Sequence, residues 1–443
     1  MTERWGSRFE RPLGAAALAR LSLGEDERLL WATMLFGARR VGYDVRGLDE
    51  QGQPKRSLLG RGASAAANVA GGAALTVLAG GGDGDNGSRP DAPRPPMVVP
   101  FGGAPDCLAA QLFRRDGLPD YDPILVALTA GRLAVLVQRE EPEESKPTSM
   151  LGKAARFGLA VGKGLAESGK AAVDIFSDRV KYYGRNVEGK PVWTPEMAPF
   201  GEMPRDRIGG VAPAQRRALK QDFPCLRVSF VDDSGLDLVL GGQDPSVPVD
   251  ARADGGRAMS DLAAWLQPGE RLMVRLPAVP GWVGARIGGT QAIPYTPARR
   301  MPEVHADPPR WPLPTERPMD DEDWPDDPTL AYWVWARDPE QDAVRFADHF
   351  AAGRAQATLV ITDRRLAIVY PRRVLEPPAE PAPEGYTTFE ESAGPSLRAL
   401  TAPHVGRSAP PSSAVRLDFH DGSTLLVAHP EAAHGIRHTG TWT

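Results

Sequence analysis

The sequence predicts an α+β fold in which one β-rich domain occurs twice. Two apolar runs carry this prediction, because each is interrupted by a short polar turn and then resumes at once, at residues 124–136 and 357–369. Such a pattern is typical of two buried strands joined by a tight turn. Two later stretches, residues 226–240 and 414–428, place an Asp/Ser/Gly turn between candidate strands, and this is hairpin chemistry.

The spacing of these stretches supports a repeat. Thr129 and Thr362 begin the two polar turns and are 233 residues apart (362 minus 129), whereas Phe230 and Phe419 precede the two hairpin turns and are 189 apart (419 minus 230). The difference of 44 residues is close to the length of an insertion at 140–184. The two halves therefore follow one order of elements, with an extra segment in the first.

Composition limits the class of protein. A chain of 443 residues is long enough for two or three domains of about 100–200 residues each. A hydrophobic fraction of 42% and a charged fraction of 25% are ordinary for a soluble globular protein. The net charge of −5 argues against a nucleic-acid binder. Cys107 and Cys225 are too few for a disulfide framework, and the N-terminus lacks the apolar core of a signal peptide, so we expect a cytoplasmic protein.

The first half divides into short elements between linkers. Residues 13–21 predict a small helix, and the apolar run at 28–36 predicts a strand, with a short buried helix as the alternative. Strands are predicted again at 97–101 and 107–113. A short helix at 256–266 is expected to close this half. Its apolar face holds Met259, Leu262, Ala263 and Leu266.

In the second half the pattern restarts with a candidate strand at 271–276. A Pro-rich and then acidic connector occupies 294–328, and the aromatic run at 330–336 predicts a strand. Residues 342–352 predict a helix, and a further Pro-rich loop covers 371–385. We place the start of this half at about 267, with about 328 as the alternative.

Residues 44–96 form the first predicted insertion. Within it, residues 62–80 carry no charge over about 19 positions, close to the ~20 needed to span a bilayer. Most of these residues are Ala and Gly, which gain little on insertion into lipid. We therefore expect a Gly/Ala-rich segment that packs closely against another helix or remains mobile, with a transmembrane helix as the alternative.

The second insertion, at 140–184, contains the clearest helical pattern of the chain, at 148–183. Apolar and glycine residues recur there at three- and four-residue steps, and charged residues occupy the other face. The glycines favour a closely packed partner helix, and contact with a membrane surface is the second interpretation. The candidate contacts to anionic lipid or to a partner are Lys153, Arg156, Lys163 and Lys170.

The order of elements in each half resembles the pleckstrin-homology-like domains of bacteria, in the broad group that includes GRAM-type modules. The residues that carry the resemblance are Gly24-Glu25 and Gly269-Glu270, Thr129 with Arg132-Leu133, Thr362 with Arg365-Leu366, Asp421-Gly-Ser423 and the looser Asp232-Asp-Ser-Gly. The resemblance implies a curved antiparallel sheet or partial barrel closed by a C-terminal helix, and binding rather than catalysis. The second copy departs from the pattern, because no clear closing helix follows Val427. The predicted domains are residues 1–266, with both insertions, and 267–443.

Motifs of catalysis and metal binding are weak. Gly60-Arg-Gly-Ala-Ser-Ala65 fits a dinucleotide pattern, but no strand precedes it. Histidines gather at the C-terminus, yet no acid or cysteine completes a zinc ligand set. The carboxylates of 320–327 sit among prolines, where we expect a solvated run. We predict no catalytic residues, no metal site and no cofactor. The five C-terminal histidines are His404, His420, His429, His434 and His438.

These observations favour a non-catalytic binding or scaffold protein with tandem domains, peripheral at a membrane through the 148–183 helix or wholly cytoplasmic. We expect a protein partner, consider an anionic membrane surface as a second partner, and expect no nucleic acid. Two other interpretations stay open. One is an enzyme without a recognisable motif, and the other is a membrane-inserted protein that uses 58–80 and 150–180 as a helical hairpin.

Overall fold

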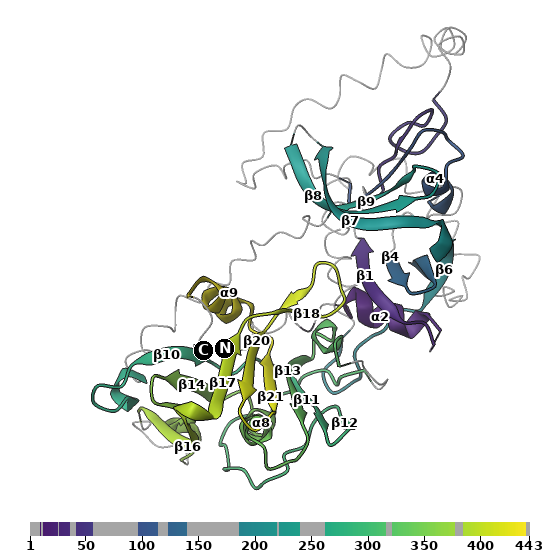
Figure 1. The fold of residues 1–443 in the computed structure, drawn as a ribbon. Coiled ribbons are helices and arrows are strands. Elements are labelled where there is room, and N and C mark those ends of the chain that lie inside the picture. Colours follow the sequence, from purple (N-terminus) through teal and green to yellow (C-terminus); the bar gives the residue numbers. More distant parts are fainter. Residues whose placement is uncertain are drawn as a thin grey trace, which may run out of the picture. The chain divides into compact units, whose positions relative to one another are not determined.

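The fold is α+β, with mostly antiparallel sheets and few helices, as the sequence predicts (Figure 1). It is known from a computed structural model. The structure describes residues 9, 12–24, 26–35, 41–55, 96–113, 123–139, 186–218, 221–239, 262–315, 321–376 and 384–439. The chain divides into two compact units. The smaller unit is Met34–Gln138 with Ala198–Val247, and the larger unit is Met1–Thr33, Arg139–Met197 and Pro248–Thr443.

The first copy of the fold contains two sheets, with strand orders β1-β4-β5-β6 and β2-β3-β9-β8-β7. Its elements are β1 (Leu29–Leu35), β2 (Asp44–Val45), β3 (Val98–Gly102), α4 (Leu108–Leu112), β4 (Ile124–Thr129), β5 (Arg132–Gln138), β6 (Met197–Pro204), η2 (Arg205–Arg207), β7 (Ile208–Ala218), β8 (Gln221–Phe230) and β9 (Gly235–Val239).

The second copy lies in the larger unit and has sheet orders β10-β14-β15-β16 and β12-β11-β13-β21-β20-β17. Its elements are β10 (Leu272–Leu276), β11 (Trp282–Ile287), β12 (Thr290–Ala292), η3 (Trp324–Asp326), β13 (Leu330–Ala336), α8 (Asp342–Ala352), β14 (Thr358–Thr362), β15 (Arg365–Pro371), η4 (Arg372–Val374), β16 (Tyr386–Ala393), η5 (Gly394–Ser396), β17 (Leu397–Thr401), β18 (His404–Val405), β19 (Ser412–Ser413), β20 (Val415–Phe419), β21 (Thr424–Val427) and α9 (Pro430–Thr439). The N-terminal helix α2 (Ala15–Ser22) also belongs to this unit.

The two copies repeat one topology. In each, a four-stranded antiparallel sheet accompanies a second sheet that contains one parallel pair, β2 with β3 or β11 with β13. Strands β5 and β15 are offset by 233 residues at both ends, and β6 and β16 by 189 at both ends. These are the two offsets that the sequence alone suggested.

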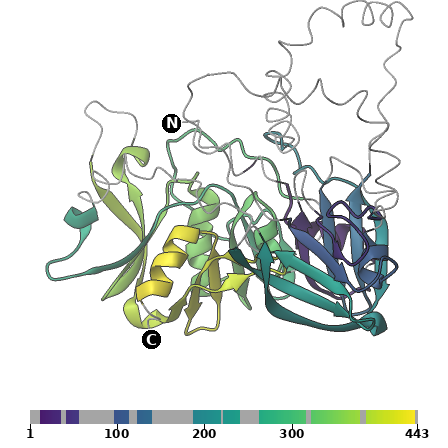
Figure 2. The same cartoon turned by 90° about the horizontal axis from the view of Figure 1, so that it is seen from above.

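The core of the second copy lies between its two sheets and its two helices. The run Thr358–Thr362 is buried at every position because side chains on both faces of β14 meet protein. On α8, Val344, Ala347 and Phe346 face the core, and Phe346 stacks on Phe419 with ring centroids 5.6 Å apart. Helix α9, yellow in Figure 2, packs against β20 and buries Ile436.

Two sequence-based expectations were wrong. Residues 107–113 are not a strand, because α4 occupies them; a short apolar run does not distinguish the two by pattern alone. A closing helix does follow Val427, namely α9. The helix predicted at 256–266 lies within the described residues only from Leu262 on. Leu262 packs against Val360 of β14, which belongs to the second copy.

The acidic connector also differs from expectation. It was expected to be solvated, yet Asp323 and Asp327 have no exposed surface and Asp326 is 6% exposed. Arg20 of α2 pairs with Asp323 at 2.7 Å. Asp327 caps the turn that follows it, because its Oδ1 accepts hydrogen bonds from Thr329 N and Oγ1. Sequence did not reveal the partner of Asp323, since Arg20 lies 303 positions away.

The Gly/Ala-rich segment at 62–80 and the predicted helix at 148–183 lie outside the described part of the chain. Among the helices that are described, none combines the length and the apolar character needed to cross a membrane.

Candidate ligand-binding site

A pocket of about 360 Å³ lies at the turn between β14 and β15, the turn around which the sequence pattern is centred. Its volume falls in the range of about 300–1,000 Å³ that is usual for small-molecule sites. Both sheets of the second copy contribute to it. The lining residues are Met273, Ile361, Thr362, Asp363, Arg364, Leu366, Gly394, Leu397, Arg398, Ala399 and Leu400.

Thr362 fixes the turn. Its Oγ1 accepts hydrogen bonds from Arg364 N at 3.2 Å and from Arg365 N at 3.0 Å, so the side chain closes the turn onto its own backbone. Thr129 does the same in the first copy, where Oγ1 accepts from Gly131 N at 3.2 Å and from Arg132 N at 3.0 Å. The Thr-x-x-Arg spacing is therefore a turn device common to both copies.

A buried ion pair holds the pocket wall behind this turn. Arg365 donates from Nε to Glu270 Oε1 at 2.8 Å and from Nη2 to Glu270 Oε2 at 3.0 Å, a bidentate geometry. Its guanidinium also lies 4.2 Å from the ring centroid of Trp265. The hydrogen bonds from Arg365 lower the pKa of Glu270 to about 2, although burial opposes this shift.

The far wall begins at η5, which is tied to the turn by the backbone. Gly394 N donates to Arg364 O at 2.7 Å. A Cβ at Gly394 would lie 2.9 Å from that carbonyl oxygen, so the close approach favours glycine. From there β17 carries Leu397 to Leu400 along the pocket.

The floor of the pocket is apolar and its rim is basic. Ile361, Leu366 and Leu400 close the floor from the core side and are at most 5% exposed. Apolar surface that a ligand can reach is added by the partly exposed Met273, Leu397 and Ala399. Two exposed arginines, Arg364 and Arg398, lie on the rim. This combination of an apolar interior and few charged groups is typical of a site that binds an amphipathic ligand.

The acids near the rim are already paired. Asp363 accepts from Arg271 N at 2.9 Å and from Arg271 Nε at 3.2 Å, and these contacts lower the pKa of Asp363. Asp418 pairs with Arg416 at 2.9 Å and lies 3.9 Å from Arg398 Nη2. Four arginines thus face two aspartates in this region, which leaves a positive balance at the rim.

The first copy keeps the frame but not these charges. The positions equivalent to Arg364 and Arg398 hold Gly131 and Gly209, by the offsets of 233 and 189 residues. Arg205 stands where the second copy has Gly394, and its Nη1 donates to Ile208 O at 3.0 Å. Arginines at these two positions are therefore a feature of the second copy rather than a requirement of the fold, and the first copy carries its arginines in η2 instead.

A second polar cluster lies at α8, with buried members at its centre and the partly exposed Arg299 and Arg345 at its edge. Asp348 has no exposed surface; its Oδ1 accepts from Tyr295 Oη at 2.7 Å and from Ala298 N at 3.0 Å. Its Oδ2 accepts from Arg299 Nε at 3.1 Å. Both the burial of Tyr295 and its hydrogen bond to Asp348 raise the pKa of that tyrosine.

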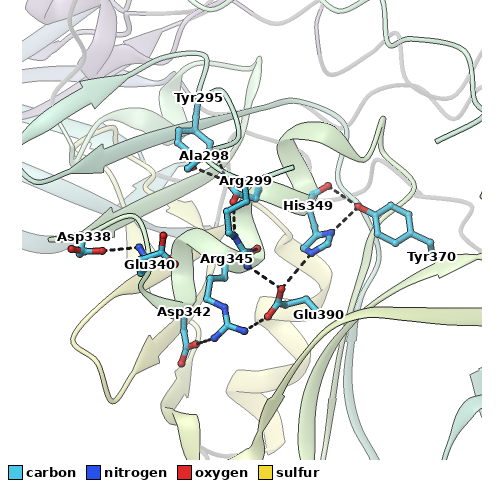
Figure 3. A network of polar contacts seen from close by, with 11 residues as sticks. Tyr295, Ala298, Arg299, Asp338, Glu340, Asp342, Arg345, His349, Tyr370 and Glu390 are labelled. Atoms are coloured by element: carbon cyan, nitrogen blue, oxygen red, sulfur yellow. Dashed lines mark hydrogen bonds and ion pairs between the residues drawn. The ribbon is translucent and has the colours of Figure 1, made fainter. Parts of the chain in front are cut away.

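Glu390 of β16 joins the other members of this cluster (Figure 3). It pairs with Arg299 at 3.3 Å and with Arg345, and it lies 3.8 Å from His349 Nε2. Burial lowers the pKa of His349, and burial raises the pKa of Tyr370, which contacts it at 3.2 Å. The cluster joins residues 295–299 to α8 and β16, and none of its members lines the pocket.

The predicted contact residues Lys153, Arg156, Lys163 and Lys170 lie outside the described residues. Among the C-terminal histidines, His429 directly precedes α9, and burial lowers the pKa of its imidazole. His404 Nδ1 lies 3.5 Å from Ser413 Oγ. Within the described ranges no three His, Cys, Asp or Glu side chains are grouped so as to hold a metal ion.

The sequence predicts the Thr362 turn, which forms one wall of the pocket, but it predicts neither the pocket nor a role for Arg398. Its signal was present, since the hairpin offset of 189 residues aligns Arg398 with a glycine. Comparison of the chain with protein-family models, with curated proteins and with solved structures returned no match.

Proposed function

We propose that this chain is a non-catalytic binding or scaffold protein built from two pleckstrin-homology-like domains. The fold supports the resemblance in outline, because each copy has two mainly antiparallel sheets and the second copy ends in a helix that packs on its core. The proposed partner is a protein or a ligand held at the second copy. A cytoplasmic location belongs to the same proposal.

The observation that carries this proposal is the separation of the pocket from the buried titratable groups. Tyr295, His349 and Tyr370 are buried in the cluster at α8, away from the pocket. The pocket lining offers apolar surface and the side chains of Thr362, Arg364 and Arg398. Its one carboxylate, Asp363, has a pKa that is lowered by hydrogen bonds from Arg271. General acid–base catalysis needs a group with a tuned pKa within hydrogen-bond reach of the substrate, so this arrangement favours binding over the rival enzyme.

Native mass spectrometry of the full chain tests the proposal. We expect the purified chain to retain a bound ligand or partner, and we expect Ala399→Trp to abolish that species by filling the pocket. The matched control is Gly210→Trp, at the equivalent position of the first copy, where no heavy atom lies within 4 Å of the added Cβ. Equal retention in both variants, or conversion of the retained molecule during incubation, would contradict a binding role for the pocket.

Membrane contact is a separate part of the proposal and concerns the predicted helix at 148–183. Vesicle co-sedimentation compares the full chain with a variant that lacks residues 140–184, on neutral and on anionic lipid. Pelleting of the full chain on anionic lipid alone, lost in the deletion, supports a peripheral contact through Lys153, Arg156, Lys163 and Lys170. If neither chain pellets, the helix has no role at a membrane and a protein partner is the remaining proposal.

A further inference from the structure

We propose that the pocket at the Thr362 turn binds an amphipathic anion, with an acyl chain on the apolar floor and its carboxylate or phosphate head between Arg364 and Arg398. This inference rests on the proposed binding function and names the class of ligand. It depends on three features of the second copy: an apolar floor, a rim with surplus positive charge, and arginines at two positions where the first copy has glycine.

The floor selects an apolar chain. Ile361 and Leu366 come from one sheet and Leu400 from the other, so the interior is apolar on both sides. Burial of apolar surface contributes about 25 cal/mol per Å², and a polar ligand placed there would leave its groups without hydrogen-bond partners. Arg365, which lies between the lining residues Arg364 and Leu366 in sequence, is fixed by its ion pair with Glu270.

The rim selects an anion. Asp363 pairs with Arg271, and Asp418 pairs with Arg416 at 2.9 Å and more distantly with Arg398 at 3.9 Å, so two carboxylates are shared among four arginines. Arg364 Nη1 makes a long hydrogen bond of 3.4 Å to Pro268 O, an uncharged acceptor. A carboxylate or phosphate would supply a charged acceptor for guanidinium groups, and such hydrogen bonds are the stronger ones.

The repeat provides an internal comparison. The Thr turn is retained in both copies with closely similar hydrogen bonds, although Arg364 is replaced by Gly131. The fold therefore does not need an arginine at this place. Gly209 likewise occupies the position equivalent to Arg398, so the fold forms in the first copy without an arginine at either rim position.

Isothermal titration calorimetry on the full chain tests this with decanoate as the probe, below the concentration at which it aggregates. We expect saturable binding of decanoate, and binding weaker by roughly tenfold or more in the Arg364→Gln/Arg398→Gln variant, because hydrogen bonds to charged groups are lost. Arg337→Gln/Arg373→Gln, which removes two exposed arginines outside the pocket lining, should bind like the native chain.

Two further probes separate the parts of the ligand. Decanol has the chain without the charge, and acetate has the charge without the chain; each should bind at least tenfold more weakly than decanoate. Equal binding of decanol overturns the role of the arginines, and equal binding of acetate overturns the role of the floor. Absence of decanoate binding overturns the inference, whereas the proposed function fails only if Ala399→Trp also leaves the retained species unchanged.

The source of the anion, a free acid or a membrane lipid, is distinguished with vesicles. If the ligand is a free acid, decanoate binds and anionic vesicles do not compete for the pocket. If it is a lipid in a membrane, anionic vesicles lower the apparent affinity for decanoate in the native chain more than neutral vesicles do at the same lipid concentration.

Discussion

Asp326 is a buried aspartate whose surroundings favour the protonated, neutral form of its carboxyl group. Its Oδ2 accepts from Ala16 N at 3.1 Å, Ala17 N at 3.2 Å and Ser408 Oγ at 2.7 Å, so it caps the first turn of α2. Burial, with a smaller contribution from the neighbouring Asp323 charge, nevertheless raises the pKa of Asp326 to about 6. The hydrogen bonds act in the opposite direction and are outweighed.

The first prediction concerns the pH dependence of stability that this carboxyl causes. Because its folded-state pKa is raised, the folded state binds more protons than the unfolded state near pH 6, and stability falls as pH rises. Relative to Asp326→Asn, the native chain should gain about 1 kcal/mol in unfolding free energy between pH 7.5 and pH 5.5. Urea unfolding at both pH values measures this, with Asp307→Asn, at an exposed site, as the control. If the difference in unfolding free energy between the native chain and Asp326→Asn is the same at both pH values, the raised pKa is contradicted.

Glu270 shows the opposite behaviour, since its pKa is lowered to about 2 by Arg365. Its contribution to stability is present above the ordinary pKa of a glutamate and is lost as pH falls toward 2. Glu270→Gln should lower the unfolding free energy by about 3 kcal/mol at pH 7, because it leaves a buried arginine with one fewer charged partner.

Glu391→Gln is the matched control for Glu270→Gln. Glu391 also pairs with Arg365, at 2.8 Å, but its side chain is 47% exposed, so its removal should cost less than about 1 kcal/mol. Denaturant titrations of both variants at pH 7 and near pH 3 give the comparison. Equal losses at pH 7 would mean that burial of the pair is not what stabilises the turn.

At the scale of elements, one hairpin turn caps one helix in each copy. In the second copy Asp421 Oδ2 accepts from Asp342 N at 2.6 Å and Ser423 Oγ accepts from Ala343 N at 3.0 Å. In the first copy Asp232 Oδ2 accepts from Leu108 N at 2.8 Å and Ser234 Oγ accepts from Ala109 N at 3.1 Å. These contacts explain why residues 107–113, predicted as a strand, begin a helix instead.

The third prediction removes this cap. Asp421→Ala should destabilise the larger unit by about 1–2 kcal/mol, because the first amides of α8 lose their acceptor. Hydrogen exchange should accelerate at the amides of Asp342 and Ala343 before it changes elsewhere in α8. Asp421→Asn keeps an oxygen acceptor and should behave nearly like the native chain. Fast exchange along the whole helix would indicate loss of packing rather than loss of a cap.

The fourth prediction uses the central residue of the same turn. Asp233 has a φ of 62° and Gly422, its equivalent, has 83°, so both adopt the left-handed conformation. Asp233→Gly should stabilise the smaller unit by up to about 1 kcal/mol, and Gly422→Asp should destabilise the larger one by a similar amount. Thermal unfolding of the two variants provides the test, and shifts in the same direction would contradict it.

At the scale of the whole molecule, the chain forms two compact units, and each unit should unfold cooperatively. Calorimetry should therefore resolve more than one unfolding transition, and Glu270→Gln should lower the midpoint temperature of one of them. Asp232→Ala, which removes the cap in the smaller unit, should lower the other. A single transition shifted equally by both variants would show that the units unfold together.

The sequence predicted the α+β class and the two offsets because strands and turns are local patterns, as in the run that contains Thr362. It did not predict the buried acids. Asp326, for example, accepts hydrogen bonds from the first amides of α2, which lie about 300 positions away in the sequence. Arg398 was missed for a similar reason, because it lines the pocket together with the Thr362 turn, which lies 36 positions earlier (398 minus 362). Local chemistry is visible in a single sequence, whereas burial depends on distant partners.

The contact of α2 with η3 has a practical consequence for dividing the chain. A fragment that starts at residue 267 would contain every strand of the second copy but would lack Arg20, which pairs with Asp323, and the α2 amides of Ala16 and Ala17, which donate to Asp326. The fragment would leave the Asp326 carboxyl without these two backbone donors, and we expect it to be less stable than the intact chain. A stable form of the second copy would require α2 to be supplied again, either by fusion or as a separate peptide.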